Sequence, residues 1–208
     1  MGRKGLLLVF SGPSGAGKGT ICRALLNEIP SLRLSVSATN RPPRSGEIEG
    51  NHYFFLEREV FEKMIENGQL LEWAEVYGNY YGTPLQYVRK TLDGGNDIIL
   101  EIDIQGALQV KEKLPEAVLI FVVPPSEADL KLRLLSRAAD AAEEIEKRLA
   151  CVAGEMIFAG RYDYIIINDV IDRAVSNAVS IISAEKSKPH YLEAFLKSFI
   201  KQEHCSSL

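Results

Sequence analysis

The segment that most constrains the fold is a short apolar run followed at once by a glycine-rich loop. The run Leu6–Ser11 has the length and composition of a buried β-strand. The loop Gly12–Thr20 reads GPSGAGKGT, and an amphipathic stretch typical of a helix, ICRALLNEI, comes directly after it. A strand, a glycine loop and a helix in this order are typical of an α/β core whose loop binds phosphate groups.

The residue types of this loop suit that chemistry. Glycines let the backbone wrap closely around a diphosphate with converging N–H groups, at angles that residues with a Cβ disfavour. The start of the following helix adds positive potential, and Lys18 is placed to reach the β- and γ-phosphates. The predicted ATP contacts in the loop are Gly12, Pro13, Ser14, Gly15, Ala16, Gly17, Lys18, Gly19 and Thr20.

The loop departs from the common pattern at one position. Ser or Thr usually follows the lysine and binds Mg²⁺ through its hydroxyl, but here Gly19 follows, and Thr20 comes one place later. Thr20 is therefore the candidate hydroxyl ligand. The alternative is that phosphates and water hold the metal ion.

The rest of the chain alternates buried strands with amphipathic segments, which predicts a parallel α/β sheet. The strands are expected at Leu6–Ser11, Asp97–Ile102, Val118–Val123 and Tyr164–Ile167. Between Ser37 and Thr83 the rhythm changes to short aromatic and β-branched runs around one helical segment, which predicts an inserted β-rich lobe. Its strands are expected at Tyr53–Leu56, Leu70–Val76 and Tyr80–Gly82, and its helix at Val60–Asn67.

Two helices with a polar turn between them are predicted in the following part of the chain. They are expected at Glu127–Ser136 and Ala142–Phe158, joined by Arg137–Ala141, and would form a lid; Tyr191–Lys201 is also helical by pattern. We expect a single domain. Its core covers about 1–36, 84–136 and 160–208, its lobe about 37–83 and its lid about 137–159.

Composition excludes several classes of function. Apolar residues make up 46% and charged residues 25% of the 208 residues, as in an ordinary globular protein. A net charge of -4 predicts neither a nucleic acid nor a membrane partner, and no apolar run approaches the ~20 residues that cross a bilayer. The three widely spaced cysteines fit neither a disulfide framework nor a zinc site, which indicates a cytoplasmic setting.

Two further segments carry a resemblance to a known family. They are SATNRPPRSGE, residues 37–47, and GNYYGT, residues 78–83. Together with the glycine loop they resemble the guanylate kinase family, and the resemblance runs from about Leu6 to about Lys186. It implies an α/β fold with a three-layer P-loop core and a parallel sheet, an inserted small mixed α/β lobe that binds a nucleoside monophosphate, and a short helical lid.

The resemblance also implies an activity. Members of this family transfer the γ-phosphoryl group of ATP to GMP with Mg²⁺ as cofactor and form GDP and ADP, a step of purine nucleotide metabolism and GMP recycling. The expected partners are therefore the small molecules GMP and ATP. The sequence does not decide whether the chain forms an oligomer.

The acceptor site follows from the same resemblance. Arg41 and Arg44 match arginines that hold the GMP phosphate, for which planar guanidinium groups are suited. Glu72 matches the carboxylate that accepts hydrogen bonds from the ring N–H and the amine of guanine, a donor pair that adenine lacks. The implied GMP contacts are Ser37, Arg41, Arg44, Glu47, Tyr53, Glu72, Tyr81, Thr83 and Asp103.

The donor site and the catalytic set are implied in the same way. Arg133, Arg137 and Arg148 match arginines that close over the triphosphate, and Asn168 matches a position near adenine. The implied catalytic residues are Lys18, Arg41, Arg137 and Arg148. The lid reads Arg137-Ala138-Ala139 where the family has a glycine after the arginine, so we expect a stiffer hinge.

The strand Asp97–Ile102 ends in acidic residues, as magnesium-organising strands beside a phosphate loop commonly do. Asp103 is thus a second candidate for the metal site, directly or through water, and Glu101 either serves the ion or pairs with a nearby cation. No general base is expected, because a phosphate monoester with a second pKa of about 6 is already mostly ionised at neutral pH. His52, His190 and His204 are therefore interpreted as surface or structural residues.

Other classes of function explain fewer of these residues. A catalytically inactive guanylate-kinase-like module that binds proteins is the main alternative, but such modules typically lack an intact phosphate loop. A GTPase switch would need an Asn-Lys-x-Asp motif, which the chain lacks. Glu72 and the SATNRPPR segment argue against an adenylate or uridylate kinase.

Overall fold

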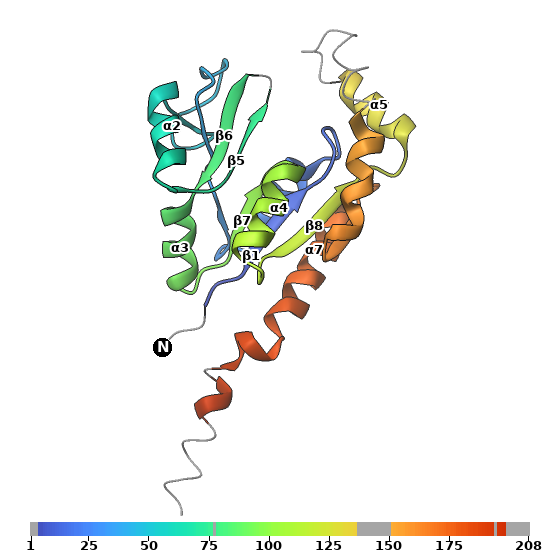
Figure 1. Ribbon diagram of the computed structural model, residues 1–208. Helices are drawn as coiled ribbons and strands as arrows, with labels where there is room; N and C mark the ends of the chain where they lie inside the picture. Colours follow the sequence, from blue (N-terminus) through green and yellow to red (C-terminus); the bar gives the residue numbers. More distant parts are fainter. Residues whose placement is uncertain (1–3, 77, 137–150, 194, 199–208) are drawn as a thin grey trace, which may run out of the picture.

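A five-stranded parallel sheet forms the centre of the protein in a computed structural model, which describes residues 4–76, 78–136, 151–193 and 195–198 (Figure 1). The strand order is β2-β7-β1-β8-β9, and every neighbouring pair is parallel. The strands are β1 (Leu7–Ser11), β2 (Arg33–Leu34), β7 (Ile98–Glu101), β8 (Val118–Val123) and β9 (Tyr164–Ile167). The predicted parallel α/β core is confirmed.

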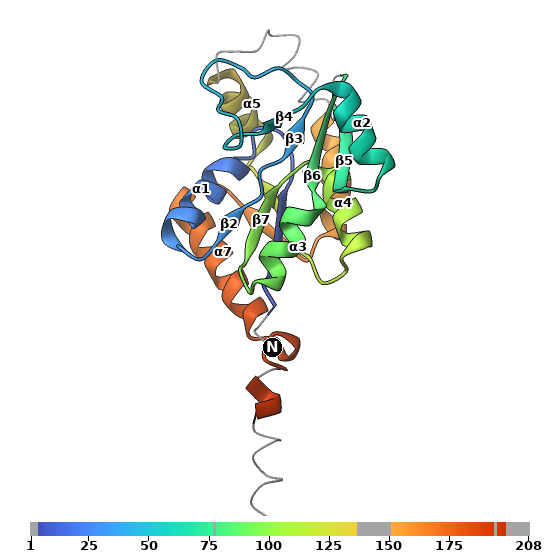
Figure 2. The same ribbon diagram turned by 90° about the vertical axis from the view of Figure 1, so that its left-hand side faces the viewer.

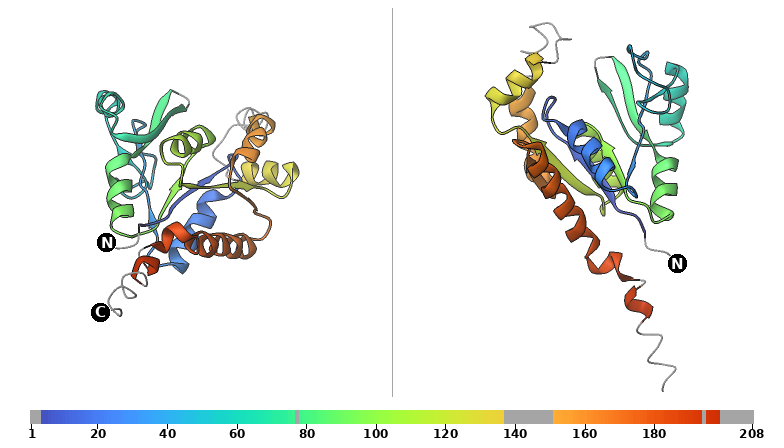
Figure 3. Two further views of the ribbon diagram at one scale, coloured as in Figure 1. Left: turned by 60° about the horizontal axis from the view of Figure 1, so that its bottom comes forward. Right: turned by 180° about the vertical axis from the view of Figure 1, so that it is seen from behind.

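Helices cover both faces of this sheet and make three layers (Figure 3). Successive side chains of a strand point to opposite faces, so each buried strand supplies two cores. Leu8 and Phe10 of β1 pack with α1 (Lys18–Glu28) and α7 (Ile171–Lys186). Leu7 and Val9 pack on the other side with α3 (Leu85–Asp93) and α4 (Ile104–Lys113).

A second, mixed sheet of four strands stands beside the core (Figures 1 and 2). Its order is β4-β3-β6-β5, in which β3 pairs in parallel with β4 and the other pairs are antiparallel. Its elements are β3 (Ala38–Thr39), β4 (Phe54–Phe55), α2 (Arg58–Glu66), β5 (Leu70–Val76) and β6 (Asn79–Pro84). Phe61 of α2 stacks on Tyr80 of β6 with ring centroids 5.3 Å apart, which fixes this helix to the sheet.

The predicted ends of several elements in this region are wrong. Helix α2 begins at Arg58 rather than Val60 and ends at Glu66, and β4 is shorter than the predicted Tyr53–Leu56. Strand β6 is longer than Tyr80–Gly82, because antiparallel pairing with β5 continues to Pro84. Periodicity marks only apolar positions, so polar first turns and paired strand ends escape it.

The last part of the chain returns to the main sheet. Helix α5 (Glu127–Ser136) agrees with the prediction, and residues 151–156 are helical. A 3-10 segment, Ile157–Arg161, then replaces the predicted end of the helix at Phe158. The turn Arg137–Ala141 and the start of that helix lie outside the described residues. A 3-10 turn, Pro189–Tyr191, precedes the tail, in which residues 193 and 195–198 are helical, within the predicted range Tyr191–Lys201.

No helix within the described ranges is both long and apolar enough to cross a bilayer.

Candidate active site

A cleft of about 550 Å³ lies where the two sheets face each other. The glycine loop lines it with Lys18, the second sheet with Glu72 and Tyr81, and the carboxyl end of β7 with Glu101 and Asp103. Ligands bind at this end of the strands in open α/β sheets. Segments far apart in the sequence thus converge on one cavity. The candidate site residues that line it are Gly12, Ser14, Lys18, Ser37, Tyr53, Glu72, Tyr81 and Asp103.

The glycine loop has the conformation and close packing that require glycine. Gly12 has φ 131°, and a Cβ there would lie 2.2 Å from the carbonyl oxygen of Val122. Gly17 has φ 93° and precedes α1 as its N-cap. A Cβ on Gly17 would lie 2.2 Å from Asn168 Nδ2, so a side chain at either position would displace the loop or its neighbour.

Lys18 begins α1 and folds back over the loop. Its Nζ donates hydrogen bonds to the carbonyl oxygens of Gly12 at 2.6 Å and Pro13 at 3.1 Å. Burial lowers the pKa of Lys18, and the negative charge of Glu101 opposes that shift. The ammonium group is therefore held at the mouth of the loop, next to the acidic end of β7.

Asn168 and Arg133 meet behind the loop rather than in the cleft. The carbonyl oxygen of Ala16 accepts from Asn168 Nδ2 at 2.8 Å and from Arg133 Nη1 at 3.3 Å. Arg133 Nη2 also donates to the carbonyl oxygen of Asn168 at 2.7 Å. Both side chains therefore support the backbone of the glycine loop, and their contact with a nucleotide stays a prediction.

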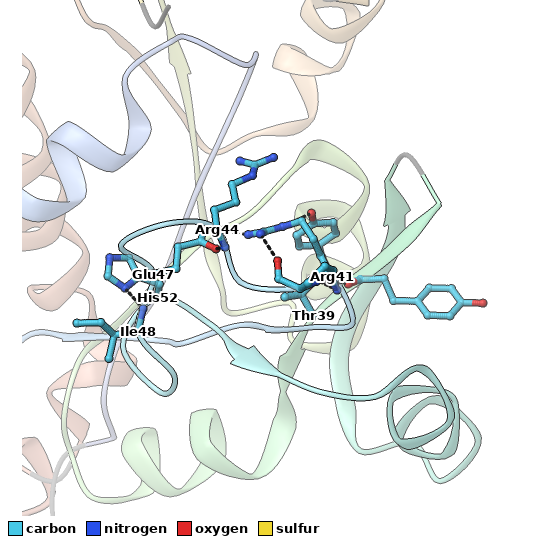
Figure 4. Close-up of polar contacts among 9 residues, drawn as sticks. Thr39, Arg41, Arg44, Glu47, Ile48 and His52 are labelled. Atoms are coloured by element: carbon cyan, nitrogen blue, oxygen red, sulfur yellow. Dashed lines mark hydrogen bonds and ion pairs between the residues drawn. The ribbon is translucent and has the colours of Figure 1, made fainter. Parts of the chain in front are cut away.

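Arg41 is held in place by a network around the loop after β3 (Figure 4). Its Nη2 donates to Glu47 Oε1 at 2.9 Å and its Nε to the Tyr81 hydroxyl at 3.2 Å. Glu47 Oε2 also accepts from the backbone N–H of Arg44 at 2.7 Å, so one carboxylate ties both arginines to one loop. The hydrogen bond from Arg41 lowers the pKa of Glu47 and keeps this carboxyl ionised.

Glu72 is the most deeply buried acid of the cleft, with only 3% of its surface exposed. Its Oε1 accepts a hydrogen bond of 2.5 Å from Thr83 Oγ1. Burial raises the pKa of Glu72 to about 7, although the bond from Thr83 opposes the shift. A buried carboxylate has two oxygens that can each accept more than one hydrogen bond, so it is suited to reading neighbouring N–H donors.

The acidic residues at the end of β7 have different surroundings. Asp103 Oδ1 accepts from the backbone N–H of Gly106 at 2.7 Å and caps α4. Glu101 lies so close to α1 that a Cβ on Gly19 would be 3.0 Å from its Oε1. Glycine at position 19 therefore makes room for this carboxylate, and Thr20 is exposed and does not line the cleft.

Sequence reasoning missed several residues of the cleft, among them two on one helix. Cys151 and Glu155 line it from the helical residues 151–156, and burial raises the pKa of Glu155 while Lys18 opposes the shift. Their i, i+4 spacing, which places both on one helical face, is the signal that could have found them. Arg137 and Arg148 lie outside the described residues.

The histidines take no part in the cleft where the structure describes them. His52 Nδ1 accepts the backbone N–H of Ile48 at 3.0 Å, and the ring of His190 lies 4.2 Å from that of Tyr191. His204 lies outside the described residues.

Comparisons with known proteins agree with one another. The family model described as guanylate kinase matches residues 4–185. Guanylate kinase of Caldanaerobacter subterraneus subsp. tengcongensis is 53% identical over 186 residues, 89% of this chain and 90% of that protein. Guanylate kinase of Clostridioides difficile is 48% identical over 97% of this chain and 98% of its own length. The crystal structure of guanylate kinase from Anaplasma phagocytophilum superposes with a TM-score of 0.75 at 34% identity, covering 92% of this chain and 95% of that one.

Proposed function

The chain belongs to the guanylate kinase family and is an ATP:GMP phosphotransferase, and from this premise we propose which of its residues perform the transfer. The observation that carries the proposal is the single cleft in which Lys18 and Glu72 lie together. A triphosphate loop and a carboxylate suited to guanine on opposite walls are what a reaction between two nucleotides requires.

GMP binds on the wall formed by the second sheet. Arg41 and Arg44 pair with its phosphate, and the hydroxyl groups of Tyr53 and Tyr81 donate to the same oxygens. Two cations on one loop suit a dianion. Glu47 supports this arrangement, because it orients Arg41 through its side chain and Arg44 through its backbone.

Guanine is read by the deeper part of the same wall. Glu72 accepts the ring N–H and the 2-amine of guanine, and Thr83 holds the carboxylate in place. Ser37 and Asp103, which also line the cleft, supply the remaining polar contacts. Adenine presents no such donor pair, so the buried Glu72 would gain no hydrogen bond from the base, which would select against AMP.

ATP binds to the glycine loop, whose backbone N–H groups and Lys18 hold its phosphates. Transfer requires alignment of the reacting oxygens and neutralisation of charge, which Lys18, Arg41, Arg137 and Arg148 provide. Arg133 and Asn168 complete the ATP site, because both support the loop through Ala16. No side chain has to remove a proton from GMP, whose phosphate is mostly ionised at neutral pH.

The residues at the end of β7 fit Mg²⁺, which prefers oxygen ligands and keeps several waters. Glu101 and Asp103 line the cleft and would hold the ion through water; among the described residues no group of three or more His, Cys, Asp or Glu side chains could form a complete metal cage. When bound, the ion neutralises charge on the transferred phosphoryl group. The exposed side chain of Thr20 would have to turn inward to join them.

We further propose that the three regions predicted from the sequence act as core, GMP lobe and lid. Closure of lobe and lid would exclude water and prevent wasteful hydrolysis of ATP. Cytoplasmic location and the absence of nucleic acid and membrane partners stay predictions.

The test is a coupled assay of nucleoside diphosphate formation with ATP and Mg²⁺, in which GMP, AMP, UMP and CMP are offered separately. We expect turnover with GMP alone. Turnover with another nucleotide would overturn the role of Glu72 in base choice. Binding of GMP without any turnover would favour the inactive interaction module.

A further inference from the structure

The strand that carries Glu72 has an edge that no other strand covers. Strand β5 is last in the order β4-β3-β6-β5, so one row of its backbone groups has no partner strand. The N-terminal half of this strand contributes Leu71 to the core that contains Ala107 and Val110 of α4. Helix α4 of the main core thus lies along the edge that would otherwise be open (Figure 1).

Gln109 of α4 replaces the missing strand partner at one residue. Its Nε2 donates to the carbonyl oxygen of Trp73 at 2.8 Å, and its Oε1 accepts from the backbone N–H of Trp73 at 3.2 Å. A side-chain amide has one donor side and one acceptor side, so it can satisfy both backbone groups of one residue, as a neighbouring strand does. Lys113 adds a hydrogen bond to the carbonyl oxygen of Leu71 at 2.7 Å.

The same face of α4 touches the Glu72 carboxylate. Gly106 lies three residues before Gln109 and therefore on the same side of the helix. A Cβ on Gly106 would be 2.5 Å from Glu72 Oε2, so only glycine allows this approach. Glu72 is thus held by Thr83 on its Oε1 and enclosed by α4 on its Oε2, while its neighbour Trp73 is tied to α4 by two hydrogen bonds.

We propose that Gln109 is a positioning residue for guanine recognition, which it serves by fixing the backbone of Trp73 and so the carboxylate of Glu72. The proposal rests on the proposed function, in which Glu72 accepts two N–H groups of guanine. Two simultaneous hydrogen bonds demand a defined carboxylate position, because both weaken as their angles depart from linearity. A substrate that offers one donor instead of two requires a less precisely defined carboxylate position.

IMP provides that substrate, since it has the ring N–H of GMP and lacks the 2-amine. Loosening β5 should therefore weaken the binding of GMP more than the binding of IMP, and so reduce the preference for GMP over IMP. A change that merely destabilised the fold would lower the active fraction for both substrates alike and leave this ratio unchanged.

The experiment compares the full-length protein with Gln109→Met, Gln109→Glu and Glu72→Gln. Methionine keeps the volume of glutamine and removes both hydrogen bonds, and glutamate keeps an acceptor and loses the donor to Trp73. Glu112→Gln, an exposed position on α4, is the matched control. The readouts are kcat and KM for GMP and for IMP, and KM for ATP.

We expect Gln109→Met to raise KM for GMP about tenfold, which corresponds to the loss of roughly one hydrogen bond between Glu72 and guanine. KM for IMP should rise by much less. Gln109→Glu should raise KM for GMP at least as much, because a carboxylate oxygen would face the carbonyl oxygen of Trp73. The KM for ATP and the control should not change. Equal changes for GMP and IMP, or an unchanged KM for GMP in Gln109→Met, would overturn the proposal.

Two results separate this proposal from the proposed function. If the wild-type protein does not turn over GMP, the proposed function itself is contradicted. If Glu72→Gln narrows the preference for GMP over IMP but Gln109→Met leaves it unchanged, only the role of Gln109 is contradicted. If the Gln109 variants fail to fold, the proposal is tested on the wild-type protein by hydrogen exchange at the backbone amide of Trp73. Slow exchange is expected for an amide bonded to Gln109, and exchange at the rate of an exposed edge would overturn the proposal.

Discussion

Thr83 Oγ1 donates a 2.5 Å hydrogen bond to Glu72 Oε1 in a site almost closed to water. The bond opposes the effect of burial but does not cancel it, and the pKa of the Glu72 carboxyl rises from 4.5 to about 7. A carboxyl group whose pKa is raised by folding destabilises the protein once it must ionise. The group that we propose to select the substrate is therefore expected to lower the stability of the empty enzyme.

We predict that Glu72→Gln gains stability relative to the wild type as the pH rises. Below pH 4.5 the carboxyl is neutral in both states, and between 4.5 and about 7 the unfolded chain releases its proton first, which favours unfolding. The difference in free energy of unfolding should grow by about 2 to 3 kcal/mol from about pH 5 to about pH 8 in urea titrations without ligand. A difference that does not depend on pH would show that the wild-type carboxyl is not perturbed.

The same pKa predicts how guanosine binding depends on pH. Ionised Glu72 can accept both donors of guanine, whereas the neutral acid offers fewer acceptors. The dissociation constant of guanosine, which lacks the titrating phosphate, should rise about tenfold per unit of pH below about 7. Calorimetry would measure it, and Glu72→Gln should bind weakly with little pH dependence.

Loss of the Lys18 charge should affect transfer and leave acceptor binding intact. Lys18 Nζ donates to the carbonyl oxygens of Gly12 and Pro13 in the glycine loop, while GMP is proposed to bind on the opposite wall. We expect Lys18→Met to lower kcat by about 10² or more. The dissociation constant of GMP should stay within about twofold, and a wild-type kcat would contradict the assigned role.

Glu47→Gln should weaken the binding of GMP and leave the binding of ATP unchanged. The substitution removes the charge that orients Arg41 at 2.9 Å and leaves an amide beside the Arg44 N–H. We expect KM for GMP to rise about fivefold to tenfold, the loss of one charge-assisted bond, with KM for ATP unchanged. Glu49→Gln is the control, because the Glu49 side chain accepts the backbone N–H of Phe55 in the same loop, at 2.8 Å, and an amide oxygen can replace it. Equal effects of the two variants would indicate a general loosening of the loop.

Asp97 supports the core far from the chemistry. It is 5% exposed, accepts the backbone N–H of Leu6 at 2.9 Å and pairs with Lys186 of α7. Asp97→Ala leaves a buried N–H and a partly buried ammonium without their acceptor, so we expect a loss of about 2 to 4 kcal/mol in urea unfolding. Glu116→Gln, which breaks the exposed pair with Lys4, should cost less than about 1 kcal/mol. KM values should not change in either variant.

Local sequence was sufficient to predict the elements that have a clear apolar pattern and clear turn residues. Strands Val118–Val123 and Tyr164–Ile167 and helix Glu127–Ser136 agree with prediction residue for residue, because their apolar pattern and turn residues act over a few positions. The glycine loop is local in the same sense. Strand β3, only two residues long, exists because β4 and β6 pair with it, and no window of sequence contains those partners.

The sequence by itself therefore determined the α/β core, the phosphate loop and several of the residues that line the cleft. Only the tertiary structure decided how they are held. Gln109 bonds Trp73, which is 36 positions away in the sequence, and Asn168 bonds Ala16, which is 152 positions away. Glu155 lines the cleft together with Lys18, although the sequence pattern assigned its helix only to a lid. Such contacts depend on how the chain packs as a whole, because hydrogen bonds and charge interactions act over a few ångströms of space whatever the separation along the chain.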